Sequence, residues 1–237
     1  MQYGYYADRE PMAYDEYPFR CPSWNPMPDG KKNVVILGCS HTWGVGLEPH
    51  ETWAHHVSQH NTNRLRYWNL GQPGYSPEAV VRMLYRTEKT LCPNIIIICW
   101  PETSRREWLD PSGGPSKKLH PRDLMGTDEK LKHHNKDTDK QTFLKSLFFV
   151  EKFAEKTNAK TFHAFASDVI ELDKAHYPTL NVLQDYTLRN CWPHWDKFTQ
   201  RELHTEPDLA RDGIHYGVEH HKRFAKLFLD CFGPKLR

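Results

Sequence analysis

Short apolar runs separated by polar, glycine-containing turns organise most of the chain after residue 33. Four of these runs have the length of strands: Val34–Leu37, Leu65–Leu70, Ile95–Cys99 and Lys160–Ala166. Runs of this length between turn residues are typical of buried strands. The four consecutive isoleucines of the third run indicate a central parallel strand that is buried on both faces. The pattern therefore predicts a parallel sheet.

Between and after these runs, apolar residues recur at helical spacing. This spacing predicts helices over residues 51–61, 78–90, 142–156 and 217–232. Ser76 followed by Pro77 marks the start of the second helix, because serine caps helices and proline is tolerated in their first turn. Strands that alternate with helices in this way predict an α/β fold on a doubly wound sheet.

Two segments show neither the pattern of a strand nor the apolar period of a helix. Residues 1–32 hold seven aromatic residues and five prolines, which predicts an extended arm that packs against its own domain or against a protein partner. Residues 100–140 are rich in Pro, Gly, Ser, Lys and His and directly follow a predicted strand. A loop of this length in a compact domain is usually a lid or a binding loop. We therefore expect an arm (1–32) and one domain (33–237) whose 100–140 loop borders the functional site.

The overall composition argues against several classes of protein. With 237 residues the chain suits one large α/β domain, and a net charge of +2 gives no strong field for nucleic acid. No apolar run approaches the ~20 residues that span a bilayer, and the N-terminus lacks the features of a signal peptide. The six cysteines form no C-x-x-C pair, which favours free thiols. The sequence thus predicts a cytoplasmic protein that binds neither nucleic acid nor membrane.

The turn after the first predicted strand carries candidate chemistry. The run Val34–Leu37 is followed by Gly-Cys-Ser-His-Thr-Trp-Gly, which places Ser40 two residues after Gly38. A serine on such a turn can project its hydroxyl beyond the carboxyl edge of the sheet, where open α/β sheets keep their sites. The backbone N–H groups of the turn can also face an oxyanion. The alternative is a serine that only caps a helix.

A second candidate group, Asp212-Gly-Ile-His215, lies just before the last predicted helix. An aspartate and a histidine three residues apart on a turn can present both side chains to one point. The carboxylate would fix the tautomer of the imidazole, whose other nitrogen would take a proton from a serine hydroxyl. The alternative is an aspartate that caps the helix beside a surface histidine.

Three sequence blocks resemble those of a known family. Gly38-Cys-Ser-His-Thr-Trp-Gly44 resembles the first block, G-D-S-x-T-x-G, of the SGNH hydrolases, also called GDSL esterases or lipases. Asn69-Leu-Gly-Gln-Pro-Gly74 resembles their second block, N-x-G-x-x-G, and Asp212–His215 resembles their last block, D-x-x-H. The blocks follow the order of the family, and the resemblance spans roughly residues 33–232.

This resemblance implies a flavodoxin-like, three-layer α/β/α sandwich with a mostly parallel sheet of about five strands. It also implies ester hydrolysis through a serine acyl-enzyme, without a cofactor or a metal. Ser40 would be the nucleophile, His215 the base and Asp212 the residue that orients the base. The backbone N–H groups of Ser40 and Gly74 would donate to the oxyanion, with Thr103 as a further donor. The substrate-binding side chains would be His41, Trp100 and Arg105.

The chain departs from the family pattern in two blocks. Cys39 stands where the family usually has aspartate, and it is expected to point inward, which argues against a cysteine nucleophile. The third block, usually G-x-N-D, is replaced by Cys-Trp-Pro-Glu-Thr-Ser-Arg-Arg at residues 99–106. The asparagine that donates to the oxyanion is therefore absent, which leaves Thr103, Ser104 or Arg105 as donors. Losing one such donor typically costs about 10²–10³ in turnover.

Two interpretations of function remain open at this stage. The first is a serine esterase for a short acyl ester, such as an O-acetyl group on a carbohydrate. The second is an inactive SGNH-fold module that binds glycan or builds a larger assembly, motivated by the missing asparagine and the aromatic arm. The third block, with tryptophan, arginine and glutamate within Trp100–Glu107, resembles that of SGNH-like proteins from marine microbes and tailed phages, which would place the protein in a virion. A metal held by Cys39, His41 and His215 lacks the spacings of zinc sites.

Overall fold

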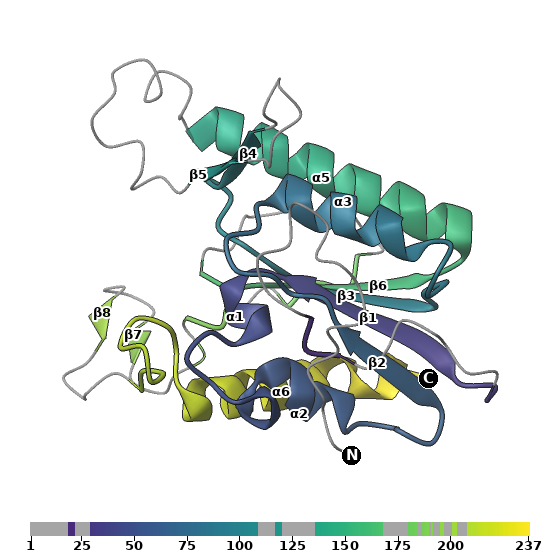
Figure 1. Cartoon of the computed structure of the whole chain (residues 1–237), viewed down its shortest axis with the longest axis horizontal. Coiled ribbons are helices and arrows are strands. Elements are labelled where there is room, and N and C mark those ends of the chain that lie inside the picture. The colour runs from purple at the N-terminus through teal and green to yellow at the C-terminus, as the bar shows by residue number, and fades with distance from the viewer. Residues whose placement is uncertain are drawn as a thin grey trace.

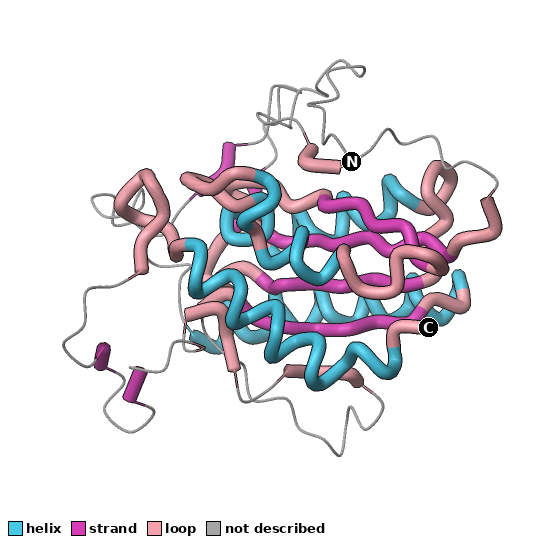
Figure 2. The backbone as a smooth tube through the Cα atoms, turned by 90° about the horizontal axis from the view of Figure 1, so that it is seen from below, coloured by secondary structure: helices cyan, strands magenta, loops and turns pink. Residues whose placement is uncertain are grey.

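The computed structural model of the chain describes residues 19–21, 29–108, 117–119, 136–167, 180–183, 186–189, 191, 195–196, 201–202 and 208–237. The centre of this described part is a parallel sheet of four strands in the order β2-β1-β3-β6, which Figure 2 shows side by side. These strands are β1 (Lys32–Gly38), β2 (Leu65–Asn69), β3 (Ile95–Trp100) and β6 (Lys160–Phe165). The four apolar runs are thus confirmed as strands of a parallel sheet.

Helices cover both faces of this sheet (Figure 1). On one face, α3 (Pro77–Thr87) packs against α5 (Lys136–Thr157). On the other face, α2 (Trp53–Ser58) packs against α6 (Val218–Phe232). The short helix α1 (Ser40–Trp43) follows directly after the carboxyl end of β1. The chain is therefore a three-layer α/β/α sandwich, as predicted.

The remaining described elements are short. Two antiparallel strand pairs are β4 (Arg106–Trp108) with β5 (Lys117–Leu119) and β7 (Trp195–Asp196) with β8 (Arg201–Glu202). Two 3-10 helices are η1 (Pro49–Glu51) and η3 (Gly233–Lys235). None of the helices in the described ranges has both the length and the apolar character that crossing a bilayer requires.

The two irregular segments predicted from the sequence are described only in part. The 100–140 segment contains β4, β5 and the first turn of α5, so its described residues are not a uniform loop. Of the predicted arm, residues 1–18 and 22–28 lie outside the described residues. Cys21, which is described, is buried in the core.

The apolar core lies between the sheet and its helices. All six residues of β3 are buried, which agrees with the central position expected from the four isoleucines. Trp53 is fully buried and meets Phe224 edge-on with a centroid distance of 5.4 Å, which joins α2 to α6. Burying large apolar side chains in this way is the main favourable contribution to folding.

Two helices, α2 and α5, start more than one residue away from the predicted position. Residues 51–61 do not form a single helix, because the Thr52 hydroxyl accepts a hydrogen bond from the His55 N–H at 3.2 Å and starts α2 there. This cap separates α2 from η1. Helix α5 begins at Lys136 rather than at residue 142, and two aspartates in its first turn favour that start by compensating the helix dipole.

The expected fifth strand is reduced to a short segment beside β6. The His163 N–H donates to the carbonyl of Asn181, and the Leu183 N–H donates to the carbonyl of His163, both at 2.8 Å. These bonds form a single parallel bridge between His163 and Val182. The described sheet therefore has four full strands and one residual strand, where about five were predicted.

Candidate active site

The turn that carries Ser40 is shaped by close backbone contacts. A Cβ added at Gly38 would lie 2.6 Å from the carbonyl oxygen of Cys99 on the neighbouring strand, so only glycine fits there. The carbonyl of Cys39 then accepts the N–H groups of Thr42 and Trp43 at 2.9 and 3.0 Å, which starts α1. Ser40 is the first residue of this helix and is 5% exposed. The predicted strand-turn-serine arrangement is present.

The second sequence block packs directly against this turn. The Asn69 side chain donates to the carbonyl of Thr42 at 2.9 Å and accepts the Gly71 N–H at 3.0 Å. The Gln72 N–H donates to the carbonyl of Gly38 at 3.1 Å. Gly74 follows in a turn with φ of 77°, a conformation that glycine adopts easily. The asparagine of this block therefore connects the serine turn to the loop that carries Gly74.

Asp212 and His215 form a hydrogen-bonded pair on a tight hairpin. Asp212 Oδ2 lies 2.5 Å from His215 Nδ1, and Asp212 Oδ1 accepts the backbone N–H groups of Ile214 and His215 at 3.1 and 3.0 Å. Burial opposes ionisation of this carboxyl, but the three hydrogen bonds outweigh it and lower the pKa of Asp212. An ionised Asp212 that accepts the Nδ1–H leaves Nε2 of His215 free to accept a proton.

The fold brings this hairpin to the serine turn. The ring of His41, the residue after Ser40, meets the ring of His215 edge-on with a centroid distance of 5.1 Å. The same His41 ring stacks on Tyr216 at 5.0 Å. Ser40 and His215, which are both among the described residues, do not form a direct hydrogen bond with each other. The imidazole of His215 therefore contacts the residue that directly follows Ser40.

Comparisons with known proteins give structural matches only. No protein-family model and no curated protein sequence matches the chain. The structure of TesA matches with a TM-score of 0.54 and 13% identity, covering 86% of this chain and 100% of that one. A GDSL-like lipase from Bacteroides thetaiotaomicron matches at 0.51 and 13% identity, covering 90% and 92%. The psychrotrophic esterase EstA from Pseudoalteromonas sp. matches at 0.50 and 12% identity, covering 87% and 99%. The chain has the SGNH-hydrolase fold.

In the SGNH fold of this chain, His41 remains neutral. Burial is the main cause that holds the pKa of His41 well below its usual value, and the nearby charges of His215, His221 and Arg105 act in the same direction. Its Nδ1 is buried and has no hydrogen-bond partner among the described residues. A neutral imidazole next to Ser40 can contact a bound molecule without repelling a protonated His215.

The predicted substrate residue Trp100 does not face the candidate site. It is fully buried, and its indole N–H donates to Nδ1 of His163 at 3.0 Å. His163 Nε2 in turn lies 3.0 Å from Glu151. This arrangement leaves Trp100 no surface for a substrate, so that expectation is corrected.

Arg105 occupies the place where SGNH proteins have their third block. It is 8% exposed, and its Nε donates to Glu102 at 3.0 Å. Burial opposes the charge of Arg105, but Cys39 and Glu102 outweigh it and raise the pKa of the guanidinium. The terminal nitrogens of Arg105 make no hydrogen bond to any described residue. Thr103, the other candidate donor, uses its carbonyl to accept from Arg106 at 2.7 Å.

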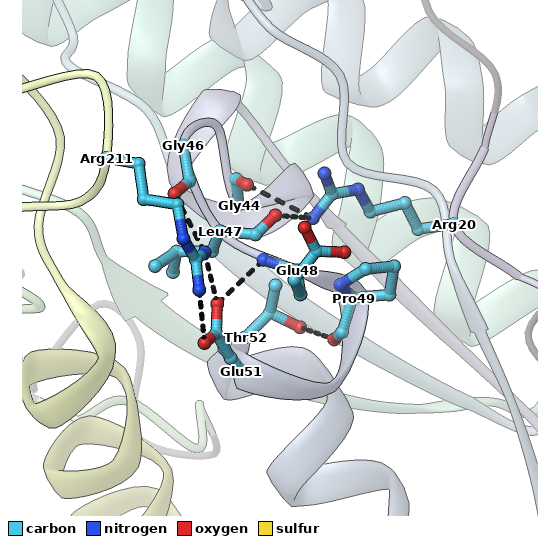
Figure 3. A network of polar contacts seen from close by, with 9 residues as sticks. All are labelled: Arg20, Gly44, Gly46, Leu47, Glu48, Pro49, Glu51, Thr52 and Arg211. Carbon is cyan, nitrogen blue, oxygen red and sulfur yellow. Dashed lines mark hydrogen bonds and ion pairs between the residues drawn. The ribbon is translucent and has the colours of Figure 1, made fainter.

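Sequence analysis missed several residues around this candidate site. Arg211 forms an ion pair with Glu51, and Arg20 donates to the carbonyls of Gly44 and Leu47 (Figure 3). The one sequence signal for a role of Arg211 was its position directly before Asp212. Its partner Glu51 lies 160 positions away, so the ion pair leaves no local sequence pattern. Within the described residues, no group of three side chains suited to hold a metal ion lies together.

Proposed function

We propose that this protein is a serine hydrolase that cleaves a short acyl ester. The observation that carries the proposal is the hydrogen bond between Asp212 and His215, on a hairpin whose histidine contacts the residue after Ser40. The same combination of an acid, a base and a hydroxyl performs nucleophilic catalysis on unrelated folds. The similarity of the fold to proteins described as a GDSL-like lipase and an esterase supports ester hydrolysis.

In this mechanism His215 acts first as a base and then as an acid. Nε2 of His215 takes the proton from Ser40 Oγ, which attacks the carbonyl carbon of the ester and forms a tetrahedral intermediate. His215 returns the proton to the leaving alcohol, and an acyl-enzyme remains. Water that His215 activates then hydrolyses the acyl-enzyme and frees Ser40. Asp212 keeps the imidazole in the required tautomer and stabilises its protonated form.

The oxyanion of the intermediate needs donors that point at it. We assign the backbone N–H groups of Ser40 and Gly74 to this role, as the family resemblance implies. For the third donor we prefer Arg105 to Thr103, because Arg105 is a buried cation with unused terminal N–H groups and acts electrostatically on both Cys39 and His41. Preorganised donors of this kind usually supply the largest part of transition-state stabilisation.

An O-acetyl group on a carbohydrate is our first choice of substrate. The rings of His41 and Tyr216 stack at the site and could lie beside a sugar. We do not assign a binding role to Trp100.

Labelling with a fluorophosphonate tests the proposal directly. Native protein should incorporate one label, Ser40→Ala should incorporate none, and His215→Ala should react far more slowly because the hydroxyl loses its base. The control is Ser58→Ala, which removes a partly buried hydroxyl on α2 that bonds to the carbonyl of His55. Native protein that does not react with the label would contradict the proposal.

A second candidate function is a binding or assembly module with the same fold. It is favoured by the absent third-block asparagine and by the missing hydrogen bond between Ser40 and His215, although such bonds are often long without a substrate. This function predicts no turnover of p-nitrophenyl acetate and a complex that depends on residues 1–32. Deleting residues 1–18, which leaves Arg20 and the buried Cys21 in place, should then remove the partner, whereas an esterase should keep its activity.

A further inference from the structure

The hairpin that carries Asp212 and His215 is joined to the loop after the serine helix by one exposed arginine. Arg211 precedes Asp212 directly, and its guanidinium forms a fork with Glu51: Nη1 lies 2.6 Å from Oε2, and Nη2 lies 2.8 Å from Oε1 (Figure 3). Paired bonds of this kind fix orientation as well as distance. The fork therefore defines how the hairpin is placed against the loop.

The carboxylate of Glu51 is itself held in position. Its Oε2 accepts the N–H of Glu48 at 2.8 Å, which closes the first turn of η1. The hydrogen bonds from Arg211 are the main reason that the pKa of Glu51 falls to about 2, so this carboxylate is ionised at any working pH. Glu51 thus presents a fixed negative charge to the hairpin.

A second contact lies beside the fork. The carbonyl of Gly46 accepts the backbone N–H of Arg211 at 3.1 Å and its Nη1 at 3.3 Å. A Cβ added at Gly46 would lie 2.8 Å from the Cβ of Ala210 and 3.0 Å from Asp212 Oδ1. The hairpin therefore rests directly on Gly46, and little space remains for any other arrangement.

The loop is also held from its other side. Arg20 donates to the carbonyls of Gly44 and Leu47 at 3.1 and 2.8 Å, and its guanidinium lies 3.5 Å from the centroid of the Trp43 ring. The residues between α1 and η1 thus lie between two arginines. Motion of this loop would move both Ser40 and the hairpin.

We propose that Arg211 and Glu51 are positioning residues that set the Asp212–His215 pair in register with Ser40. This inference rests on the proposed esterase function. The ion pair is a poor source of stability, because the Arg211 side chain is 59% exposed and water screens such pairs. Its effect is on geometry, and a displacement of about 1 Å at a catalytic group can cost about 10² in rate.

The test compares four variants in the full chain. Arg211→Ala removes the fork, Glu51→Gln keeps an oxygen for the Glu48 N–H but loses the charge, and Arg211→Lys keeps the charge without the fork. Lys226→Ala is the control, since it removes another exposed ion pair, with Asp230 on α6. The measurements are the rate of Ser40 labelling, kcat and KM for p-nitrophenyl acetate, and Tm.

We expect Arg211→Ala and Glu51→Gln to lower the labelling rate and kcat by about 10- to 100-fold, with KM within about twofold and Tm close to native. Arg211→Lys should be intermediate, because lysine makes a single point contact. Added guanidinium chloride, but not ammonium chloride, should restore part of the Arg211→Ala rate. Lys226→Ala should match native protein.

Native labelling rates in Arg211→Ala and Glu51→Gln would overturn the inference, as would an equal loss in Lys226→Ala. Failure of native protein to label would instead overturn the esterase function. In that case the low-field proton resonance of His215 Nδ1–H decides the matter: loss of this signal in Arg211→Ala supports the positioning role, and an unchanged signal overturns it.

Discussion

At the scale of single residues, the buried guanidinium of Arg105 is the clearest departure of the candidate site from the SGNH sequence pattern. It is charged, almost enclosed, and oriented by Glu102 through one of its five N–H groups. Glu102 pairs with this charge through Nε, and the terminal N–H groups remain available to a second anion. A developing oxyanion at Ser40 would be such an anion.

Replacing this cation should affect the rate far more than binding. We expect Arg105→Ala to lower kcat about 10²–10³-fold with little change in KM, because the donor acts mainly in the transition state. Arg105→Lys should keep part of the activity. Arg106→Ala is the neighbouring control, since that guanidinium pairs with Asp139. Full activity of Arg105→Ala would leave Thr103 or Ser104 as the donor.

A second residue, His221, should make folding sensitive to acid. Its buried Nδ1 accepts the backbone N–H of Trp53 at 2.9 Å at the start of α2. Burial, followed by the charges of His220 and His56, lowers the pKa of His221 to about 3. The unfolded chain therefore binds more protons between pH 6 and 4, and the native state loses stability as the pH falls, by up to about 1.4 kcal/mol per pH unit from this group.

Urea unfolding at several pH values checks this prediction. His221→Asn retains an acceptor for the Trp53 N–H but cannot take up a proton, so its free energy of unfolding should fall less steeply between pH 6 and 4. His50→Asn, at a surface position, is the control and should keep the native slope. Identical slopes for native protein and His221→Asn would exclude His221 as the source.

The residues of the site differ in how far the sequence reveals them. Ser40, Asp212 and His215 stand in short blocks whose residue types and order indicate their chemistry. Trp100 sits beside these blocks in the sequence but is buried in the core, because helices cover both faces of β3 and all six of its residues are buried. The partnership of Arg211 with Glu51 leaves no periodic signal, since only the fold brings the two together.

At the scale of elements, β1 and α1 meet without any room for side chains between them. A Cβ at Gly38 would lie 2.1 Å from the Thr42 hydroxyl and 2.6 Å from a backbone oxygen of β3. The strand and the helix can therefore turn this sharply only around a glycine. The sequence predicted the four strands of the sheet well because their apolar runs are distinct. The predicted start of α2 was wrong, because the Thr52 cap overrides the apolar pattern. The short strand segment at residues 181–183 was not predicted, because three residues are too few to show a period.

Gly38→Ala should damage both stability and reactivity. Overpacking against a backbone oxygen typically costs about 1–3 kcal/mol, and relief of the clash would displace Ser40 and slow its labelling. Gly30→Ala is the matched control, because Gly30 has a φ of 73° but no atom within 4 Å of its added Cβ. That variant should lose some stability through strain and label at the native rate. Equal labelling rates would contradict the role of Gly38.

At the scale of the whole molecule, the parallel sheet explains why distant segments share one site. Strands β1 and β3 end together, with Gly38 beside Cys99, so the loops that leave them meet at one edge. The hairpin before α6 returns to that edge because α6 packs against α2 on the adjoining layer. The strand order and the packing of α6 thus bring His215 into contact with His41, the residue after Ser40.

Along β6, a lateral edge strand of the sheet, the described residues that pair with the strand are those of the short segment 181–183. The Asn181 side chain secures this segment by donating to the carbonyl of Thr161 at 3.0 Å and accepting from Lys235 at 3.0 Å. Asn181→Ala should therefore expose the unpaired edge of β6 while most of the core stays intact. An exposed edge strand can pair with strands of other molecules. When warmed, the variant protein should therefore form oligomers, visible by light scattering, below its unfolding temperature. A few residues remote from the chemistry would then determine whether the protein stays monodisperse.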